Sequence, residues 1–215
     1  MSESIFLIPI FVFVLFYSVI IHECAHAISA RFMGDPTAYY LGRITLNPVK
    51  HIDIFGTILL PAILIITRAP FLFGWAKPVP INPSNFRHPD RGMMLSSIAG
   101  PASNFILAII GSAIFVLVYR MFAPSDAINF LYEAFFDPLI KINIILGIFN
   151  LIPIPPLDGS RVLRYFLPWK MKEDFDRLET FGMVIVVIIV FTGGTVFIGK
   201  ILNLVTQLLN YLINI

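Results

Sequence analysis

The stretch that decides the fold lies near the N-terminus, where residues 5–26 read IFLIPIFVFVLFYSVIIHECAH. We expect the apolar run Ile5–Ile21 to be helical and to continue to about Met33, before Asp35-Pro36 ends the helix. Such a helix is long enough to cross the hydrocarbon of a membrane, which takes about 20 residues. Two histidines, His22 and His26, follow the apolar run. Because positions i and i+4 share one face of a helix, both imidazoles can reach one metal ion.

The composition indicates a helical membrane protein. Of the 215 residues, 58% are hydrophobic and 13% are charged, whereas soluble domains are nearer half apolar and a quarter charged. The apolar residues come in long runs, which predicts an all-α polytopic membrane protein with about five to six apolar segments. The sequence shows no nucleic-acid-binding patch, and its one cysteine, Cys24, excludes an internal disulfide framework. No polar stretch approaches domain size, so residues 1–215 are expected to form a single membrane-embedded domain.

The later apolar segments differ in how well they fit a membrane crossing. Met93–Phe122 is a strong spanning helix, whereas Phe130–Ile152 is weakened at Asp137-Pro138. The final region, Phe181–Ile215, is broken at Thr192-Gly193-Gly194-Thr195. Its polar residues recur in steps of three and four, which predicts an interfacial helix or one packed on a polar interior: Lys200, Asn203, Gln207, Asn210 and Asn214.

Two segments are expected not to be helical. Thr37–Pro48 is mixed in polarity, and we predict short strand pieces or a hairpin there, as a small β element near the membrane interface. Gly74–Arg91 contains Pro78, Pro80, Pro83 and Pro89, and this density of proline favours extended backbone over helix.

The histidine pair would form a catalytic zinc site with a third protein ligand and one position left open for water. Glu23 follows the first histidine, where it can take a proton from that water once the metal has lowered its pKa. Ionisable side chains at membrane depth cost at least about 2.5–3.5 kcal/mol each and usually mark function. Asp158 is the best third ligand, because the prolines before it unwind a helix where irregular backbone must be buried or line a water-filled cavity. The other candidates are Asp35, His51, Asp53, His88 and Asp137.

Two signatures make the chain resemble the site-2 protease family of intramembrane zinc metalloproteases. One is His22-Glu23-x-x-His26 in a hydrophobic helix, and the other is Asn150-x-x-Pro153-x-Pro155-x-Leu157-Asp158-Gly159. Gly100-Pro101-x-x-Asn104 and the segment Gly74–Pro80, which is similar to that of compact bacterial and archaeal members, also fit. The resemblance extends from Val19 to Arg164 and predicts the compact prokaryotic type without a PDZ or CBS domain.

The resemblance implies a cofactor, residue roles and partners. It implies that Zn²⁺ is bound by His22, His26 and Asp158. It also implies that Glu23 is the general base and that Asn150 polarises the scissile carbonyl or holds the substrate. Members of the family cleave membrane-spanning helices, so the implied partners are single-span membrane proteins within the lipid bilayer. The sequence does not indicate an oligomeric state.

The proposed ligands also constrain topology. His26 and Asp158 follow two different spanning helices, and those helix ends must lie on one side of the membrane to share a metal ion. The chain must therefore cross an odd number of times between the two helices, so Ile54–Phe73, the shorter and proline-broken segment, is expected to be re-entrant or a hairpin. This topology places most basic residues in the cytosol, together with the active site, in the plasma membrane of a prokaryote. The residues on that side are Arg31, Arg43, Lys50, Arg68, Lys77, Arg87, Arg91, Arg161, Arg164, Lys170, Lys172 and Arg177.

A substrate helix must unwind before its peptide bonds become accessible, so the cleaved segment is expected to be extended. Backbone near Thr37–Leu46 or at Ile154–Leu157 would then pair with it by strand addition. Ile154, Pro155 and Leu157 are accordingly the candidate substrate-binding residues.

Two other functions fit part of the pattern. A divalent-metal transporter would use similar ligands, although transport sites usually draw them from discontinuous helices. A catalytically inactive scaffold would bind membrane partners without cleaving them. Glu23 beside the first histidine and the signature that ends at Asp158 favour the protease over both.

Overall fold

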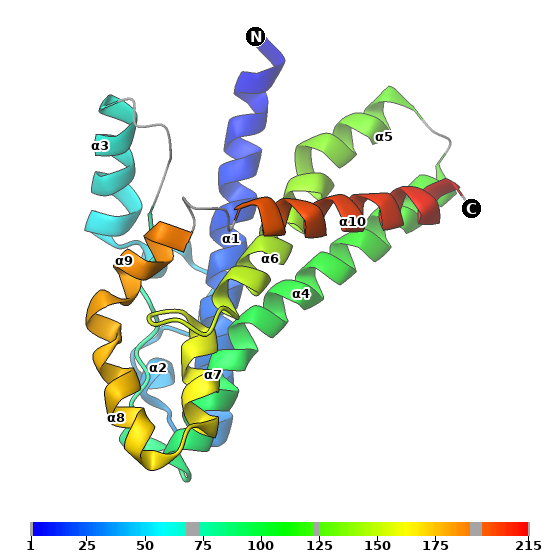
Figure 1. Cartoon of the computed structure of the whole chain (residues 1–215). Coiled ribbons are helices and arrows are strands. Elements are labelled where there is room, and N and C mark those ends of the chain that lie inside the picture. The colour runs from blue at the N-terminus through cyan, green and yellow to red at the C-terminus, as the bar shows by residue number, and fades with distance from the viewer. Residues whose placement is uncertain (1, 68–73, 123–124, 190–194, 215) are drawn as a thin grey trace.

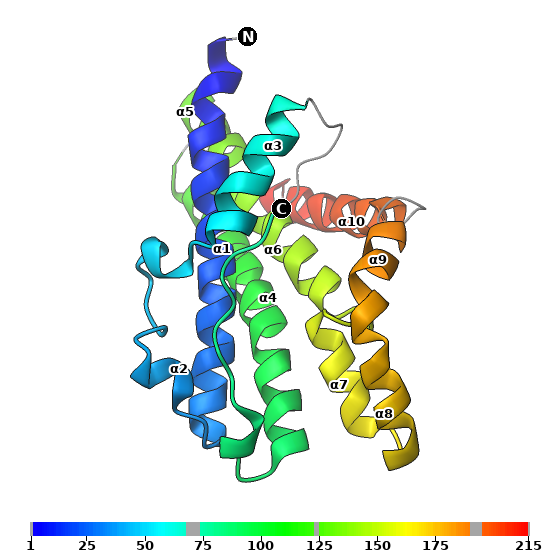
Figure 2. The same ribbon diagram turned by 90° about the vertical axis from the view of Figure 1, so that its left-hand side faces the viewer.

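Two long helices that lie side by side form the axis of the molecule (Figures 1 and 2). The computed structural model describes residues 2–67, 74–122, 125–189 and 195–214. All regular elements in this part of the chain are helical, which confirms the predicted all-α class. In chain order they are α1 (Ser2–Met33), α2 (Thr37–Tyr40), η1 (Pro48–His51), η2 (Ile54–Leu59), α3 (Leu60–Ile66), η3 (Pro83–Asn85), α4 (Pro89–Met121), α5 (Asp126–Leu131), η4 (Tyr132–Phe136), α6 (Asp137–Asn150), α7 (Asp158–Phe166), α8 (Trp169–Arg177), α9 (Glu179–Ile189) and α10 (Thr195–Asn214).

The helices α1 and α4 are the two in the described residues that are long and apolar enough to cross a membrane, at Leu7–Met33 and Pro89–Met121. Only 28% and 22% of the residues in their most apolar windows are buried inside the protein. The core helix of a soluble protein would be mostly buried, so these apolar faces are the kind of surface that lipid covers. The larger number of five to six apolar segments is not confirmed.

The third helical stretch runs without a break from Asp126 to Asn150 through α5, η4 and α6. Pro138 lacks a backbone N–H, and the wider helical turn η4 lies directly before Asp137-Pro138. At the predicted weak point, Asp137-Pro138, the helix therefore widens locally but does not break. Lys141 pairs with Asp137 one turn away, with Nζ 2.7 Å from Oδ1, and the buried face of α6 packs on α4.

The residues that follow position 73 lie next to the start of the segment that begins at Ile54. Helical residues Ile54–Ile66 are too few to cross a membrane. Beyond them, the amide of Trp75 donates to the carbonyl of Gly56 at 3.2 Å, and the amide of Lys77 donates to that of His51 at 2.9 Å. These bonds bring the two ends of the segment together, as expected for a re-entrant segment or a hairpin, although residues 68–73 lie outside the described part.

The β element predicted over Thr37–Pro48 is not observed in this part of the described chain. Thr37–Tyr40 form the short helix α2, and turns follow. The cause is local, because the buried carboxylate of Asp35 accepts hydrogen bonds from the amide and hydroxyl of Thr37 and so turns the chain at this point. The same carboxylate accepts from Asn82 and Asn85. Although burial alone raises the pKa of Asp35, these hydrogen bonds hold it below its usual value.

The C-terminal part continues from α7 into α8 and α9, which lie beside α7 in both views (Figures 1 and 2). Arg164 on α7 binds both Asp90 on α4 and Asp176 on α8, and Lys172 also binds Asp90. On α10, Ile201, Leu202, Val205 and Leu209 pack against α4 and α6. The predicted polar stripe is exposed at Lys200, Asn203, Gln207 and Asn210. The predicted break within residues 192–195 falls largely on residues that are not described.

Candidate metal centre

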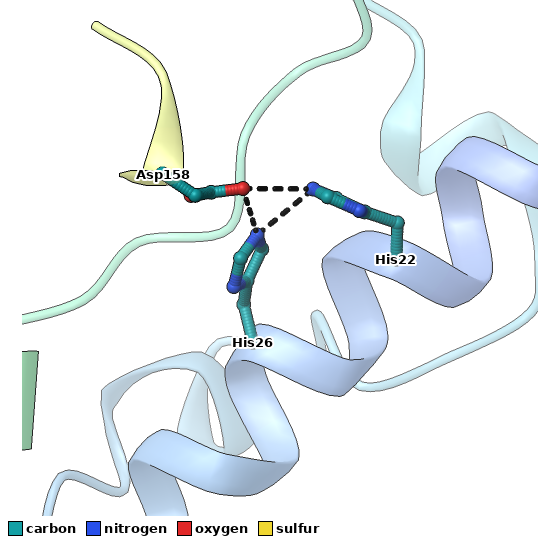
Figure 3. A group of neighbouring side chains, drawn as sticks. All are labelled: His22, His26 and Asp158. Carbon is teal, nitrogen blue, oxygen red and sulfur yellow. Dashed lines mark hydrogen bonds and ion pairs between the residues drawn. The ribbon is translucent and has the colours of Figure 1, made fainter. Parts of the chain in front are cut away.

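Three side chains from α1 and α7, two helices far apart in the sequence, converge on one point (Figure 3). His22 and His26 project from one face of α1, one turn apart. Asp158 is the first residue of α7 and follows the proline-rich turns that end α6. Its carboxylate therefore stands at a helix N-terminus, where the helix dipole favours negative charge. All three residues are buried, with exposed fractions of 6%, 6% and 8%.

The spacing of the three ligand atoms fits one zinc ion. The Nε2 atoms of His22 and His26 are 2.9 Å apart, and each lies 3.2 Å from Oδ2 of Asp158. Tetrahedral zinc with bonds of about 2.0–2.1 Å needs ligand atoms about 3.3 Å apart. Two imidazole nitrogens and one carboxylate oxygen are also the donors that catalytic zinc uses, with the fourth position left for water. These residues could thus hold Zn²⁺ with little movement.

Hydrogen bonds on the far side of each ring fix both histidines for this role. Nδ1 of His22 lies 2.6 Å from Oδ1 of Asn104, and Nδ1 of His26 lies 2.7 Å from the carbonyl of Ser96. Both acceptors require a proton on Nδ1, so each Nε2 lone pair points toward the metal position. Both partners belong to α4, which therefore orients the ligands that α1 supplies.

A buried amide chain supports Asn104. Its Nδ2 donates to Oδ1 of Asn143 on α6 at 2.8 Å, and Nδ2 of Asn143 donates to the hydroxyl of Ser18 on α1 at 2.8 Å. Exposed fractions of 0% for both asparagines and 1% for Ser18 leave no room for water to replace these bonds. The chain of bonds sets which end of the Asn104 amide faces His22, and it joins the three central helices.

Gly100 lets the two rings lie against α4. A Cβ at this position would overlap Cε1 and Nε2 of His26 and approach Cε1 of His22 to 2.6 Å. The glycine is therefore part of the site, although it offers no ligand atom.

Gly100→Ala is expected to displace both imidazoles and to lower zinc affinity at least about 10-fold, as loss of a supporting contact at a metal site does. Alanine is the better helix former, so the helix itself should not be weakened. Zinc content after dialysis against a graded chelator measures the effect. Gly199→Ala is the matched control, because nothing lies within 4 Å of a Cβ there. Equal zinc affinity in the two variants would contradict the close approach at Gly100.

Glu23 lies beside this centre and is partly exposed. Its Oε2 accepts a hydrogen bond of 2.7 Å from the amide of Val79, in the extended segment that follows residue 74. The carboxylate is thus anchored by one oxygen, while the other remains available for a water molecule or a substrate group.

The other predicted site residues precede Asp158 in the chain, and in the described part of the structure they make no hydrogen bond or ion pair with the three ligands. Asn150 donates through Nδ2 to the carbonyl of Leu146 at 3.0 Å. The amides of Ile154 and Leu157 donate within their own turn, and Pro155 has no N–H. The carbonyls of Ile154 and Leu157 already accept hydrogen bonds from Leu157 and Ser160, and that of Pro155 lies against Gly182. The loop must therefore change its backbone hydrogen bonds before it can pair with an incoming chain.

The structure places the remaining ligand candidates elsewhere. Asp35 holds the loop at Asn82–Asn85, Asp53 caps η2 and Asp137 pairs with Lys141. His51 is fully buried, with Nε2 2.9 Å from the carbonyl of Thr45. His88 lies in the cap position before α4.

Sequence reasoning missed the supports of the site. Asn104 belongs to the motif Gly100-Pro101-x-x-Asn104, which by itself predicts no role for this residue, and Asn143 belongs to no motif. An asparagine inside an apolar helix, such as Asn143, is itself a signal of a buried polar contact. The backbone groups of Ser96 and Val79 carry no such signal.

Comparison with known proteins adds independent evidence. The family model described as Peptidase family M50 matches residues 118–193. Two relatives carry the name "Putative zinc metalloprotease": YwhC of Bacillus subtilis, 40% identical over 86% of this chain and 82% of its own length, and Rip2 of Mycolicibacterium smegmatis, 29% identical over 81% and 64%. Zinc metalloprotease MJ0392 of Methanocaldococcus jannaschii is 28% identical over 79% of this chain and 38% of its own length. No solved structure matches the chain.

Proposed function

Since the chain belongs to peptidase family M50, the site-2 protease family, we propose that it hydrolyses peptide bonds within or near the transmembrane segments of other membrane proteins. The chain is a zinc metalloprotease of a membrane-embedded family, and its cofactor is Zn²⁺. We assign the zinc ligands as His22, His26 and Asp158 and the general base as Glu23. The convergence of the three buried ligand atoms, 2.9–3.2 Å apart, carries this proposal.

The reaction divides between the metal and one carboxylate. Bound zinc supplies Lewis acidity, which lowers the pKa of water and polarises the scissile carbonyl. Glu23 takes the proton from the attacking water and delivers it to the leaving amine. The Val79 amide holds one carboxylate oxygen of Glu23, so the second oxygen is the one that transfers the proton. Asn150 uses one N–H of its side-chain amide for the Leu146 carbonyl, and its second N–H is the donor that would assist at the scissile carbonyl.

The proposed substrates are single-span membrane proteins. The apolar outer faces of α1 and α4 would lie against lipid, where such a substrate helix arrives. A cavity of ≈ 530 Å³ lies between the start of α4 and the helices α7 and α8. It borders Pro155 and Pro156, which belong to the loop that leads to the proposed ligand Asp158. An unwound substrate in this cavity would lie against the loop Ile154–Leu157, and Ile154, Pro155 and Leu157 are the proposed substrate contacts. We propose that residues 1–215 act as one catalytic domain.

The active site is proposed to face the cytosol of a prokaryotic cell. The C-terminal end of α1, the start of α4 and the helix α8 lie together at the end opposite the N-terminus (Figures 1 and 2). These elements carry Arg31, Arg91, Lys170, Lys172 and Arg177. A concentration of Lys and Arg on one side supports a cytosolic location for that side.

Reporter fusions test this orientation. Fusions at Lys77 and Lys170 are expected to report the same, cytosolic side, because Lys77 precedes the crossing α4, and Lys170 follows the return of the chain through α5, η4 and α6. A fusion within Ser125–Ile128 is the control and should report the opposite side, since α4 separates it from Lys77. Opposite reports from Lys77 and Lys170 would overturn the topology.

Cleavage in proteoliposomes tests the function. Wild-type protein with zinc is expected to cut a model single-span substrate within or near its apolar segment, with the position mapped by mass spectrometry. Chelation should stop the reaction and added zinc should restore it. Cleavage confined to the soluble part of the substrate, or none at all with zinc bound, would refute the proposal.

A further inference from the structure

A buried arginine that takes no part in metal binding contacts the backbone next to Glu23. Arg43 is 8% exposed, and its Nη2 donates to the carbonyl of Lys77 at 2.8 Å and to that of Pro78 at 3.2 Å. The next amide along the chain, that of Val79, is the one that donates to Oε2 of Glu23 at 2.7 Å. Two carbonyls held by a guanidinium thus immediately precede the donor that anchors the acid.

The segment around these residues is held along its length. The amide of Lys77 donates to the carbonyl of His51, and the amide of Asn82 donates to the carboxylate of Asp35. Pro78 and Pro80 restrict the backbone on either side of Val79. Within the described part of the chain, Arg43 alone donates to the carbonyls directly before Val79. Arg43 is therefore the side chain placed to set the direction of the Val79 amide.

We propose that Arg43 is a positioning residue for hydrolysis, which acts through the Lys77–Val79 backbone to fix the carboxylate of Glu23. This inference rests on the proposed role of Glu23 as general base. A glutamate side chain is flexible, and holding one of its oxygens aims the other, whereas a misplacement of about 1 Å costs on the order of 100-fold in rate. Arginine suits this role because its guanidinium is planar, always charged and carries several N–H donors, so that it can donate to two carbonyls at once.

Arg43→Met keeps the length of the side chain and removes its donors. In the zinc-loaded protein, kcat for a model substrate is expected to fall on the order of 10- to 100-fold while KM stays within about 2-fold. Arg43→Lys should recover most of the loss, because the ammonium can still donate to one carbonyl. Arg91→Met, the same change at an exposed arginine, is the control and should leave kcat unchanged.

A purely structural role predicts a different result. It would reduce the amount of folded, zinc-loaded protein but leave kcat of that fraction at the wild-type value, and this outcome would overturn the proposal. If Arg43→Met yields no zinc-loaded protein, Val79→Pro replaces it, because proline removes the N–H that donates to Glu23. Val79→Ala keeps that N–H and serves as its control, so equal kcat in the two Val79 variants would also overturn the proposal.

The result is separable from that of the proposed function. If Glu23→Gln retains cleavage, the general-base assignment fails and the proposal for Arg43 fails with it. If Glu23→Gln is inactive while zinc-loaded Arg43→Met keeps the wild-type kcat, only the assignment of Arg43 fails.

Discussion

Glu23→Gln is expected to bind zinc as the wild type does and to lose cleavage by a factor of about 10²–10⁴, the usual contribution of a general base. Glutamine has the same shape, and its carbonyl oxygen can still accept the bond from the Val79 amide, so the fold around the site should remain. What it cannot do is accept the proton of the attacking water. Zinc content per chain, measured beside the cleavage rate of a single-span substrate, separates binding from catalysis.

Glu133→Gln is the control for this variant, since Glu133 is exposed on η4 and removed from the centre. It should retain both zinc and activity. Wild-type cleavage by Glu23→Gln would show that another group accepts the proton. Loss of zinc together with activity would instead indicate that Glu23 stabilises the metal site and would contradict its assignment as a base alone.

Asp158→Asn is expected to lower zinc affinity at least about 100-fold and to abolish cleavage at ordinary zinc concentrations. Removal of a partner outside the ligand shell typically costs 10- to 100-fold in affinity, so loss of a direct ligand should cost more. An amide oxygen carries no charge and is a poorer zinc ligand than a carboxylate. Competition with a chromogenic chelator measures the affinity, and excess zinc should restore part of the activity.

Asp126→Asn makes the same change at a matched position, because Asp126 also stands in the first turn of a helix but is exposed. It controls for the loss of a favourable interaction with a helix dipole, which is worth about 0.3–1 kcal/mol. Wild-type zinc affinity in Asp158→Asn would remove Asp158 from the ligand set and reopen the search for the third ligand.

The convergence of the three ligand residues could be predicted from the sequence because each step follows a rule of spacing or backbone chemistry. Residues i and i+4 share a helix face, and a run of prolines ends a helix, so that the residue that follows can turn toward a buried site. Because His26 and Asp158 must meet, the segment Ile54–Phe73 is predicted to reverse the direction of the chain. The hydrogen bonds that Trp75 and Lys77 donate to Gly56 and His51 bring the two ends of this segment together.

The helix α2 could not be predicted in this way. Thr37, Tyr39 and Tyr40 favour strands, and glycine follows them, so propensity pointed to a hairpin. The carboxylate of Asp35 decides the local structure through bonds to Thr37 and to residues some fifty positions away. Short segments follow such tertiary contacts more than they follow propensity.

The supports of the site were hidden for a related reason. The bond from Val79 to Glu23 and that from Ser96 to His26 use backbone groups, which every residue possesses and which leave no trace in the sequence. Asn104 and Asn143 could have been paired as polar residues on two apolar helices, but their register is set only when α1, α4 and α6 pack together.

X-ray absorption at the zinc edge of the purified wild-type protein tests the central claim most directly. We predict one zinc per chain, with two imidazole nitrogens and carboxylate or water oxygens at about 2.0–2.2 Å and no sulfur near 2.3 Å. A protein that purifies without binding added zinc, a spectrum with fewer than two imidazoles, or a sulfur ligand from Cys24 would contradict the assignment of the metal centre to His22, His26 and Asp158.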